Sequence, residues 1–353
     1  MKNKKFFFIK GIIIFIILFL FVGKANKIFI KNNIRIKRWD SFYKIPKNEL
    51  DIIFMGSSHS YATYNPKIID SKLGINSFNL ASNSQGIDQL YFNLKEVLKY
   101  QTPSYVFIEL FSSASTIRKN VNYAQYDNLD GQNFSINKIQ SVKAYMPKKD
   151  YLNSLFPFIR EHKMWNNVKM ITSNIKRYRK NSDYDKSLLS FDGFEPGKSI
   201  MSDETALKYE NEDKKSFKGY TYSKTRIEYL NKIKKLSEEN GFKIIYVYSP
   251  MYREFINPTY SYKYKYLKEL SKKYANDLLD FNYIGKDAGL SKKSFANEYH
   301  GYQHTSKIGS TQITNYVAKY LKGKIKPKKN EEYWKIRNKG YINLFDEKKF
   351  SNN

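Results

Sequence analysis

The chain has 353 residues, enough for one large domain or two small ones with a buried core. Its 41% hydrophobic and 27% charged residues are typical of a folded protein and exclude a chain that is disordered throughout. A formal net charge of +29 indicates attraction to anionic polymers. Nucleic acid is not expected among them, because the sequence has no zinc-finger spacing, RNP aromatic signature or basic heptad region. The absence of cysteine excludes disulfides, thiolate metal sites and cysteine nucleophiles.

The N-terminus carries a long apolar stretch. Residues 6–23 are apolar apart from Lys10, which predicts one N-terminal transmembrane helix within an anchor of residues 1–24. The same stretch also fits an export signal that is cleaved near Gly23. Because a short basic N-terminus before an apolar core is typical of export, we expect a single-pass protein of the cell membrane with its large domain on the extracytoplasmic side.

After a basic connector at residues 25–49, the sequence alternates between strand and helix patterns. Five short apolar runs predict strands at residues 51–55, 77–81, 105–110, 243–249 and 278–283. Amphipathic spacing predicts helices at residues 88–100, around 227–236 with a C-cap at Asn240–Gly241, and at 306–321. This alternation predicts an α/β fold in three layers, with a central parallel sheet covered on both faces.

A long insertion interrupts this alternation. Within a domain of residues 50–322, residues 112–222 are polar and rich in Asn and Lys, with a helical section near 148–180. An insertion after the third strand would lie at the carboxyl ends of the strands, where open α/β sheets bind ligands, so we expect it to shape substrate specificity. A poorly ordered excursion is the alternative for residues 180–222. Residues 323–353 are expected to form a peripheral C-terminal extension.

The first strand runs into a Gly-Ser-Ser-His turn at residues 56–59. A serine hydroxyl becomes a nucleophile when a base takes its proton, and a tight turn at a strand end holds it clear of the sheet. The turn is not the G-x-S-x-G elbow of the α/β hydrolases, because Ser60 replaces the second glycine. Among the four histidines, the candidate base is His304, which lies just before the last predicted helix.

With a Gly-Ser-Ser turn after the first strand and a histidine before the last helix, the chain resembles the SGNH/GDSL hydrolase superfamily. Within it, the chain is most similar to the membrane-anchored DltD-like branch, whose members take part in acyl transfer to cell-envelope polymers. The resemblance implies a flavodoxin-like fold with Ser58 as nucleophile and His304 as base, and Gly309 matches the glycine five residues after the histidine. It also implies an oxyanion hole formed by the backbone N–H groups of Ser58 and Gly86, with Asn83 as a possible side-chain donor.

The chain departs from the superfamily pattern at two places. Gly301 stands three residues before His304, where the superfamily has the aspartate that orients the histidine. A backbone carbonyl could take its place and leave a Ser-His dyad, or Glu298 could supply the carboxylate. The Gly-x-Asn-Asp block that completes the oxyanion hole is also absent, and Ser112 or Ser113 is the candidate replacement.

Two further histidines invite other interpretations. His300 and His304 have the i, i+4 spacing of a helical metal site, but Gly301 lies between them and the glutamate of H-E-x-x-H is missing, so we expect no metal. His59 adjoins the candidate nucleophile, yet neighbouring side chains at such a turn usually point apart. We therefore expect His59 to line the cleft.

These features predict a serine esterase or acyltransferase that acts on an anionic cell-envelope polymer, such as teichoic acid or polysaccharide. We expect the reaction to proceed through an acyl-enzyme without a cofactor. The expected partners are the membrane, the anionic polymer and a membrane acyltransferase. The alternative is a catalytically inactive SGNH-like envelope protein that binds or organises the acyl-transfer machinery. The missing aspartate and asparagine motivate this alternative.

Overall fold

The computed structural model describes residues 2–30, 34–111, 121, 123–179, 192–195, 197, 199–300, 303–327 and 331–338. The chain divides into two compact units. The first comprises Met1–Lys37 and Ile117–Tyr184, and the second comprises Arg38–Thr116 and Asp185–Asn353. The predicted insertion at residues 112–222 is thus divided between the two units.

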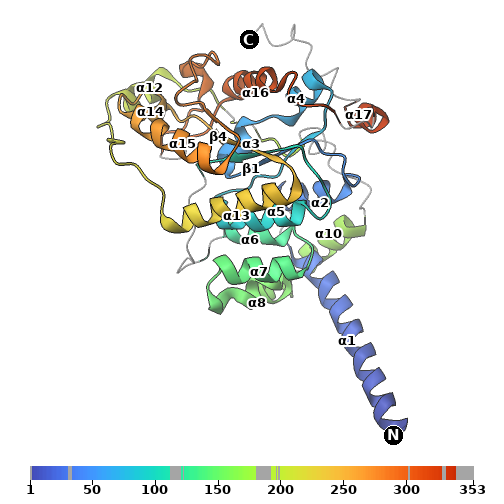
Figure 1. The fold of residues 1–353 in the computed structure, drawn as a ribbon. Coiled ribbons are helices and arrows are strands. Elements are labelled where there is room, and N and C mark those ends of the chain that lie inside the picture. The colour runs from blue at the N-terminus through green and yellow to red at the C-terminus, as the bar shows by residue number, and fades with distance from the viewer. Residues whose placement is uncertain are drawn as a thin grey trace. The chain divides into compact units, whose positions relative to one another are not determined.

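The second unit is built on five parallel strands in the order β2-β1-β3-β4-β5 (Figure 1). Ile53 at the centre of β1 pairs with Phe78 on β2 and with Val106 on β3. All five predicted strands are confirmed, within one residue at their N-terminal ends and three at their C-terminal ends: β1 (Ile52–Met55), β2 (Ser77–Asn79), β3 (Tyr105–Glu109), β4 (Lys243–Tyr248) and β5 (Asp277–Asp280). The strand order reverses between β1 and β3, and open α/β sheets bind ligands beside the carboxyl ends of the strands at such a point.

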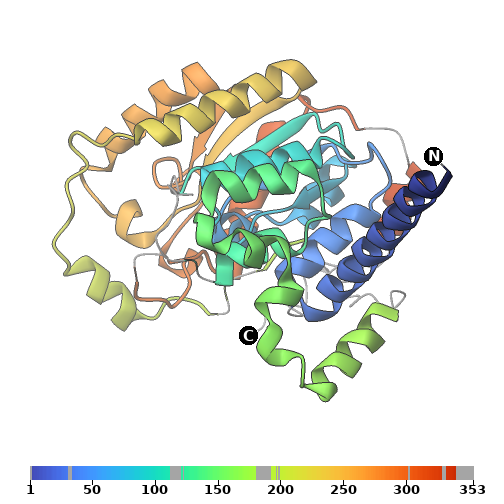
Figure 2. The same ribbon diagram turned by 90° about the horizontal axis from the view of Figure 1, so that it is seen from below.

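One face of the sheet is covered by α2 (Ile34–Lys44), α5 (Ile87–Val97), α13 (Lys224–Asn240) and α15 (Tyr260–Tyr274), and Figure 2 gives the view from this side. The helices predicted at 88–100 and around 227–236 are confirmed as α5 and α13, and Gly241 ends α13 with a φ of 74°. Part of the predicted connector also belongs to this core. Trp39 and Phe42 of α2 are buried against the sheet, so residues 25–49 are more than a linker.

The other face of the sheet carries α3 (Ser58–Thr63), α4 (Pro66–Leu73) and α16 (Lys307–Leu321), with α4 and α16 side by side in Figure 1. The helix predicted at 306–321 is confirmed. Ser306 caps it by accepting a hydrogen bond from the backbone N–H of Gly309. A Cβ atom at Gly309 would lie 2.0 Å from the carbonyl oxygen of Ser294, so only glycine allows α16 to approach the short 3-10 helix at Lys292–Ser294 this closely.

The second unit also contains α12 (Asp203–Glu210), α14 (Tyr252–Phe255) and α17 (Glu331–Asn338). The buried guanidinium of Arg337 on α17 lies 3.5 Å from the Asp70 carboxylate and 3.0 Å from that of Asp192. Lys67 completes the cluster with a 2.8 Å contact to Asp192. Part of the expected peripheral extension is therefore tied into the second unit by buried ion pairs.

The regular elements in the described part of the first unit are all helices. This unit contains α1 (Lys2–Phe29), α6 (Tyr123–Asp130), α7 (Ile136–Tyr145), α8 (Tyr151–Leu155), α9 (Pro157–Arg160) and α10 (Val168–Arg179), with 3-10 turns at Lys148–Asp150 and His162–Met164. A small core of Leu129, Val142, Tyr145 and Met146 joins α6 to α7, and α9 and α10 pack on α1. Among the described residues, no helix combines the length and the apolarity that a membrane crossing requires, so the transmembrane helix predicted at residues 6–23 has no support here.

Candidate functional site

The serine turn, residues 56–59, begins where β1 ends against β3. Gly56 has a φ of 145°, a backbone conformation that side chains disfavour. A Cβ atom at Gly56 would lie 2.5 Å from the Cβ of Glu109, the last residue of β3. Glycine is therefore required at position 56 both for its backbone conformation and for the contact between the two strand ends.

The three serines of this region have different surroundings. Ser57 is buried as the N-cap of α3; its Oγ donates a hydrogen bond to Glu109 Oε2 at 3.0 Å and accepts one from the His59 backbone N–H at 3.3 Å. Ser60 is fully buried. Ser58 is partly exposed at the first position of α3. The hydroxyl that a substrate can approach is therefore that of Ser58, the predicted nucleophile.

Glu109 is a site residue that the sequence interpretation missed. Its Oε1 accepts a hydrogen bond from the Phe111 backbone N–H at 2.8 Å, while its Oε2 holds Ser57. Complete burial raises the pKa of Glu109 to about 7, although these hydrogen bonds oppose the shift. A signal was present in the sequence, because a glutamate ends an otherwise apolar strand three positions before the serine-rich run at residues 112–115.

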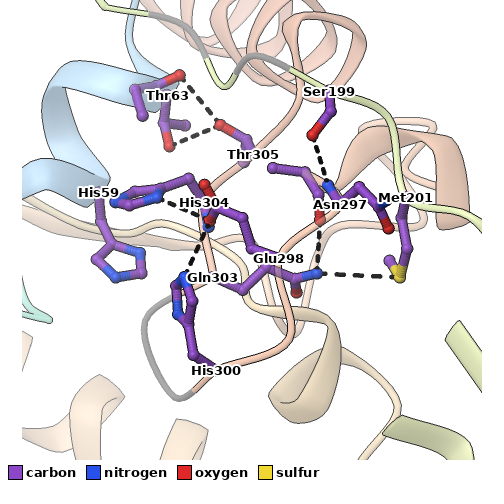
Figure 3. A network of polar contacts seen from close by, with 12 residues as sticks. His59, Thr63, Ser199, Met201, Asn297, Glu298, His300, Gln303, His304 and Thr305 are labelled. Atoms are coloured by element: carbon purple, nitrogen blue, oxygen red, sulfur yellow. Dashed lines mark hydrogen bonds and ion pairs between the residues drawn. The ribbon is translucent and has the colours of Figure 1, made fainter. Parts of the chain in front are cut away.

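The histidine loop, the described residues of 296–306, supplies an orienting carboxylate. Glu298 Oε2 lies 2.9 Å from His304 Nδ1 and also accepts a hydrogen bond from the His304 backbone N–H at 2.9 Å (Figure 3). Partial burial opposes ionisation of Glu298, but these hydrogen bonds and the nearby His304 and His300 outweigh it and lower the Glu298 pKa. Of the two replacements considered for the missing aspartate, the geometry favours Glu298. Gly301 lies outside the described residues.

The contact with Glu298 fixes the chemistry of the His304 ring. A carboxylate accepts hydrogen bonds, so Nδ1 carries the proton and Nε2 is left as the basic nitrogen. His304 Nε2 is buried and has no hydrogen-bond partner within the part of the chain that the structure describes. This is the tautomer that a general base for a serine requires.

The histidine loop is held in place by the second half of the predicted insertion. The hydroxyl of Tyr209 on α12 donates to the Glu298 carbonyl oxygen at 2.8 Å and accepts from the His300 backbone N–H at 3.2 Å. His300 Nε2 lies 3.7 Å from Glu298 Oε2, so Figure 3 shows two histidines beside one carboxylate. Residues between β3 and β4 thus support the position of the candidate base.

Threonine and serine hydroxyls join the serine turn to the histidine loop. Thr305 Oγ1 donates to the carbonyl oxygen of Ala62 at 3.1 Å and lies 3.2 Å from Thr63 Oγ1. Ser310 Oγ donates to the Thr63 carbonyl oxygen at 2.7 Å. Because α3 begins at Ser58 and the loop ends beside Thr305, these bonds bring the two predicted catalytic residues to one edge of the sheet.

His59 lies between the two segments. Its ring centroid is 5.1 Å from that of His304 and 3.9 Å from that of Phe111. The expectation that it lines the cleft is not met, since only 1% of the residue is exposed. Burial, and then the charge of a protonated His304, lowers the pKa of His59 well below its usual value, so its ring is neutral. His304 is therefore the histidine placed to accept a proton.

The predicted oxyanion-hole groups differ in their hydrogen bonds within the protein. The Gly86 backbone N–H donates to Gln89 Oε1 at 3.1 Å, within the capping box that starts α5. Asn83 accepts a hydrogen bond from the Tyr61 hydroxyl through its Oδ1. The Ser58 backbone N–H belongs to the first turn of α3, where helical N–H groups have no acceptor within the helix. Ser112 and Ser113 lie outside the described residues.

In the described part of the chain, no three histidine and carboxylate side chains are arranged to hold a metal ion. Comparison with known proteins adds no identification. No protein-family model matches the chain, and no curated protein matches it in sequence.

Proposed function

We propose that the second unit is an SGNH-like serine esterase or acyltransferase with Ser58 as nucleophile, His304 as general base and Glu298 as orienting carboxylate. One observation carries the proposal. Glu298 holds His304 in the tautomer whose Nε2 is free of a proton, beside the helix that begins at Ser58. Ser58 is partly exposed, whereas Ser57 is buried. In a serine triad, a carboxylate orients the histidine in this way and leaves Nε2 to take the proton of the serine.

The strand order supports this assignment. The order 2-1-3-4-5 is that of flavodoxin-like folds, the fold expected for the SGNH superfamily. The switch point lies between β1 and β3. Ser58 follows β1, and Glu109 ends β3 beneath the serine turn. The candidate site is therefore at the position where this kind of sheet binds ligands.

The reaction follows from the positions of the three side chains. Ser58 Oγ attacks an ester or thioester carbonyl while His304 Nε2 takes its proton, and the Glu298 carboxylate stabilises the imidazolium. When the tetrahedral intermediate collapses, the leaving group receives this proton and the acyl group stays on Ser58. Water or a polymer hydroxyl then attacks the ester; His304 takes the proton of this group and returns it to Ser58 Oγ.

The developing oxyanion needs donors. The backbone N–H of Ser58 is one, and a second would come from Gly86 if its N–H turned from Gln89 Oε1 to the substrate. Asn83 would supply a side-chain donor. Substrate binding would thus complete the oxyanion hole, since one of its groups is engaged within the protein in this structure.

Charge and apolar surface support the cellular setting. A net charge of +29 suits an anionic acceptor such as teichoic acid or a charged polysaccharide. The described part of α1 exposes large apolar side chains from Phe6 to Phe21, which suits attachment to the cell membrane with the second unit on the extracytoplasmic side. A membrane acyltransferase is the partner class that would supply the acyl group.

A second candidate function rests on the oxyanion hole. The Gly86 N–H donates to Gln89 and is not directed at a substrate, as expected for an SGNH-like protein that has lost its activity. Such a protein would bind envelope polymer or organise acyl-transfer enzymes. It differs from the main proposal in one respect, since its Ser58 would not react.

Labelling of the full-length protein with a fluorophosphonate probe tests the main proposal. Wild-type protein should be labelled, and Ser58→Ala and His304→Ala should lose the label. Ser60→Ala is the matched control: Ser60 lies on the same helix, fully buried, and its Oγ has no hydrogen-bond partner among the described residues, so its loss should leave labelling intact. Equal labelling of Ser58→Ala would overturn the assignment, and an unlabelled wild-type protein would favour the inactive alternative.

A further inference from the structure

The first unit exposes apolar side chains on α9, on α10 and on the segment between them. Ile159 is 42% exposed, Trp165 46% and Val168 69%. We call these three residues the α9–α10 surface. Exposed large apolar side chains that gather on one short segment mark an interaction site more often than single ones do.

This surface is fixed to α1 by aromatic contacts. Phe158 contacts Phe29 edge-on at 5.4 Å between ring centroids and Phe21 at 6.4 Å. Trp165 stacks on Phe158 at 4.6 Å, and its indole N–H donates to the Phe158 carbonyl oxygen at 2.9 Å. The exposed indole is therefore fixed against the C-terminal part of α1, residues 21–29, which we call the base of α1.

Backbone contacts hold both helices on α1 as well. The Phe158 backbone N–H donates to Asn26 Oδ1 at 3.1 Å. On α10, the buried Asn174 donates from Nδ2 to the Ile28 carbonyl oxygen at 2.7 Å. In Figure 1, α10 accordingly lies beside the C-terminal end of α1. The α9–α10 surface thus has a defined place relative to α1.

The described residues of α1 from Phe6 to Phe21 expose mainly apolar side chains. The exposed side chains include Phe6, Phe7, Phe8, Ile9, Ile12, Ile13, Ile14, Ile17 and Phe21. Five positions separate Phe21, the last of these residues, from Asn26, which is about 7.5 Å along a helix. The α9–α10 surface therefore lies about one headgroup layer away from the apolar part of α1.

The charge of this region suits an anionic partner. Residues 157–179 contain six Lys or Arg and one acidic residue, Glu161. Glu161 is paired with Arg160 at 3.0 Å, whereas Lys163 and Lys169 are exposed next to Trp165 and Val168. Amphipathic helices with Trp and aliphatic residues on one side and Lys on the other bind in the headgroup layer of anionic membranes.

From these observations we infer that the α9–α10 surface rests in the headgroup layer of an anionic phospholipid bilayer. It would form a collar around the base of α1, with Trp165 and Val168 at the acyl boundary and Lys163 and Lys169 on lipid phosphates. The inference rests on the proposed attachment of α1 to the membrane. It gives the first half of the predicted insertion a role in holding the protein on the membrane rather than in specificity.

Because the chain lacks cysteine, single substitutions place a nitroxide spin label at one chosen position of the full-length protein. Three variants are compared in vesicles of equimolar phosphatidylglycerol and phosphatidylcholine: Val168→Cys, Ser173→Cys and Phe7→Cys. Ser173 is also exposed on α10, but it lies about 140° around the helix from Val168 and serves as the matched control. The measurement is the collision rate of each label with a water-soluble nickel chelate and with oxygen.

The inference predicts that the Phe7 label is shielded from nickel, that the Val168 label is several-fold less accessible to nickel than the Ser173 label, and that the Ser173 label remains aqueous. A Val168 label as accessible to nickel as the Ser173 label, with the Phe7 label shielded, would overturn the lipid collar. A Phe7 label exposed to nickel would overturn the membrane attachment and the collar together. Neither outcome affects the test of Ser58.

Discussion

The serine turn and the histidine loop lie at the same edge of the sheet, and each is held by one carboxyl group. The pKa values of these two carboxyl groups are shifted in opposite directions. Beneath the serine turn, the carboxyl group of Glu109 is fully buried, and its pKa is raised to about 7. In the histidine loop, the carboxylate of Glu298 is partly exposed, and its pKa is lowered. The first carboxyl group fixes the backbone beneath the nucleophile, and the second orients the base.

This difference separates two tasks within one site. A carboxyl group that only positions a turn can be buried and can remain protonated up to neutral pH, because its task is to hold Ser57 and the Phe111 backbone. A carboxylate that stabilises a histidine cation must be ionised, so hydrogen bonds and the neighbouring histidines favour its charged form.

The larger expected effect follows from Glu298→Gln in the histidine loop. The amide removes the negative charge that stabilises the imidazolium and no longer selects the tautomer with a basic Nε2. We expect a fall in kcat of about 10² to 10⁴, the upper value being the loss when the aspartate of a serine triad becomes asparagine. The assay is hydrolysis of an activated ester by the full-length protein, and unchanged thermal unfolding is the control for folding. An unchanged kcat would show that His304 works as a dyad without Glu298.

The smaller effect follows from Glu109→Gln and concerns stability. The folded-state pKa of Glu109, about 7, exceeds the ordinary value of 4.5, so the folded protein binds the extra proton between these values. Glu109 therefore lowers the free energy of unfolding as pH rises from about 4.5 to about 7, by at most about 1.4 kcal/mol per pH unit. Asp70 and Asp280, whose pKa values are also raised to about 7, add slopes of the same sign.

The Glu109→Gln variant should therefore show a shallower loss of stability over this pH range than the wild-type protein, while the part due to Asp70 and Asp280 remains. Denaturant unfolding at several pH values measures both slopes. Glu298 provides the opposite case, because its lowered pKa adds stability that is lost as pH falls through that pKa. Parallel stability profiles for wild-type protein and Glu109→Gln would contradict the buried role of Glu109.

The strands, the helices that cover the sheet and the placement of Ser58 and His304 at one edge could be predicted from the sequence. Each depends on local signals: β1 is an uninterrupted apolar run, α13 ends at Asn240–Gly241, and Ser306 caps α16. Hydrophobic periodicity and capping are short-range, so a single sequence contains them.

The remaining features depend on contacts between distant segments. Glu109 holds a serine 52 positions earlier in the chain, and Arg337 pairs with Asp70 from the far end of the sequence. Glu298 stands six residues before His304 in a loop whose path no periodicity fixes, so the sequence left it as one of two alternatives. The burial of α2 was not predicted, because its many charged residues interrupt the apolar pattern to which the buried Trp39 and Phe42 belong. Such side chains are recognised only once the fold brings their partners together.

Mapping the covalent adduct identifies which serine of this region is the nucleophile. The full-length protein is treated with a fluorophosphonate, digested and analysed by tandem mass spectrometry of the peptide that contains residues 57–60. We expect the phosphonyl group on Ser58 alone, with loss of the adduct when His304 is replaced by alanine. An adduct on Ser57 or Ser60, or one that forms at the same rate without His304, would contradict this assignment.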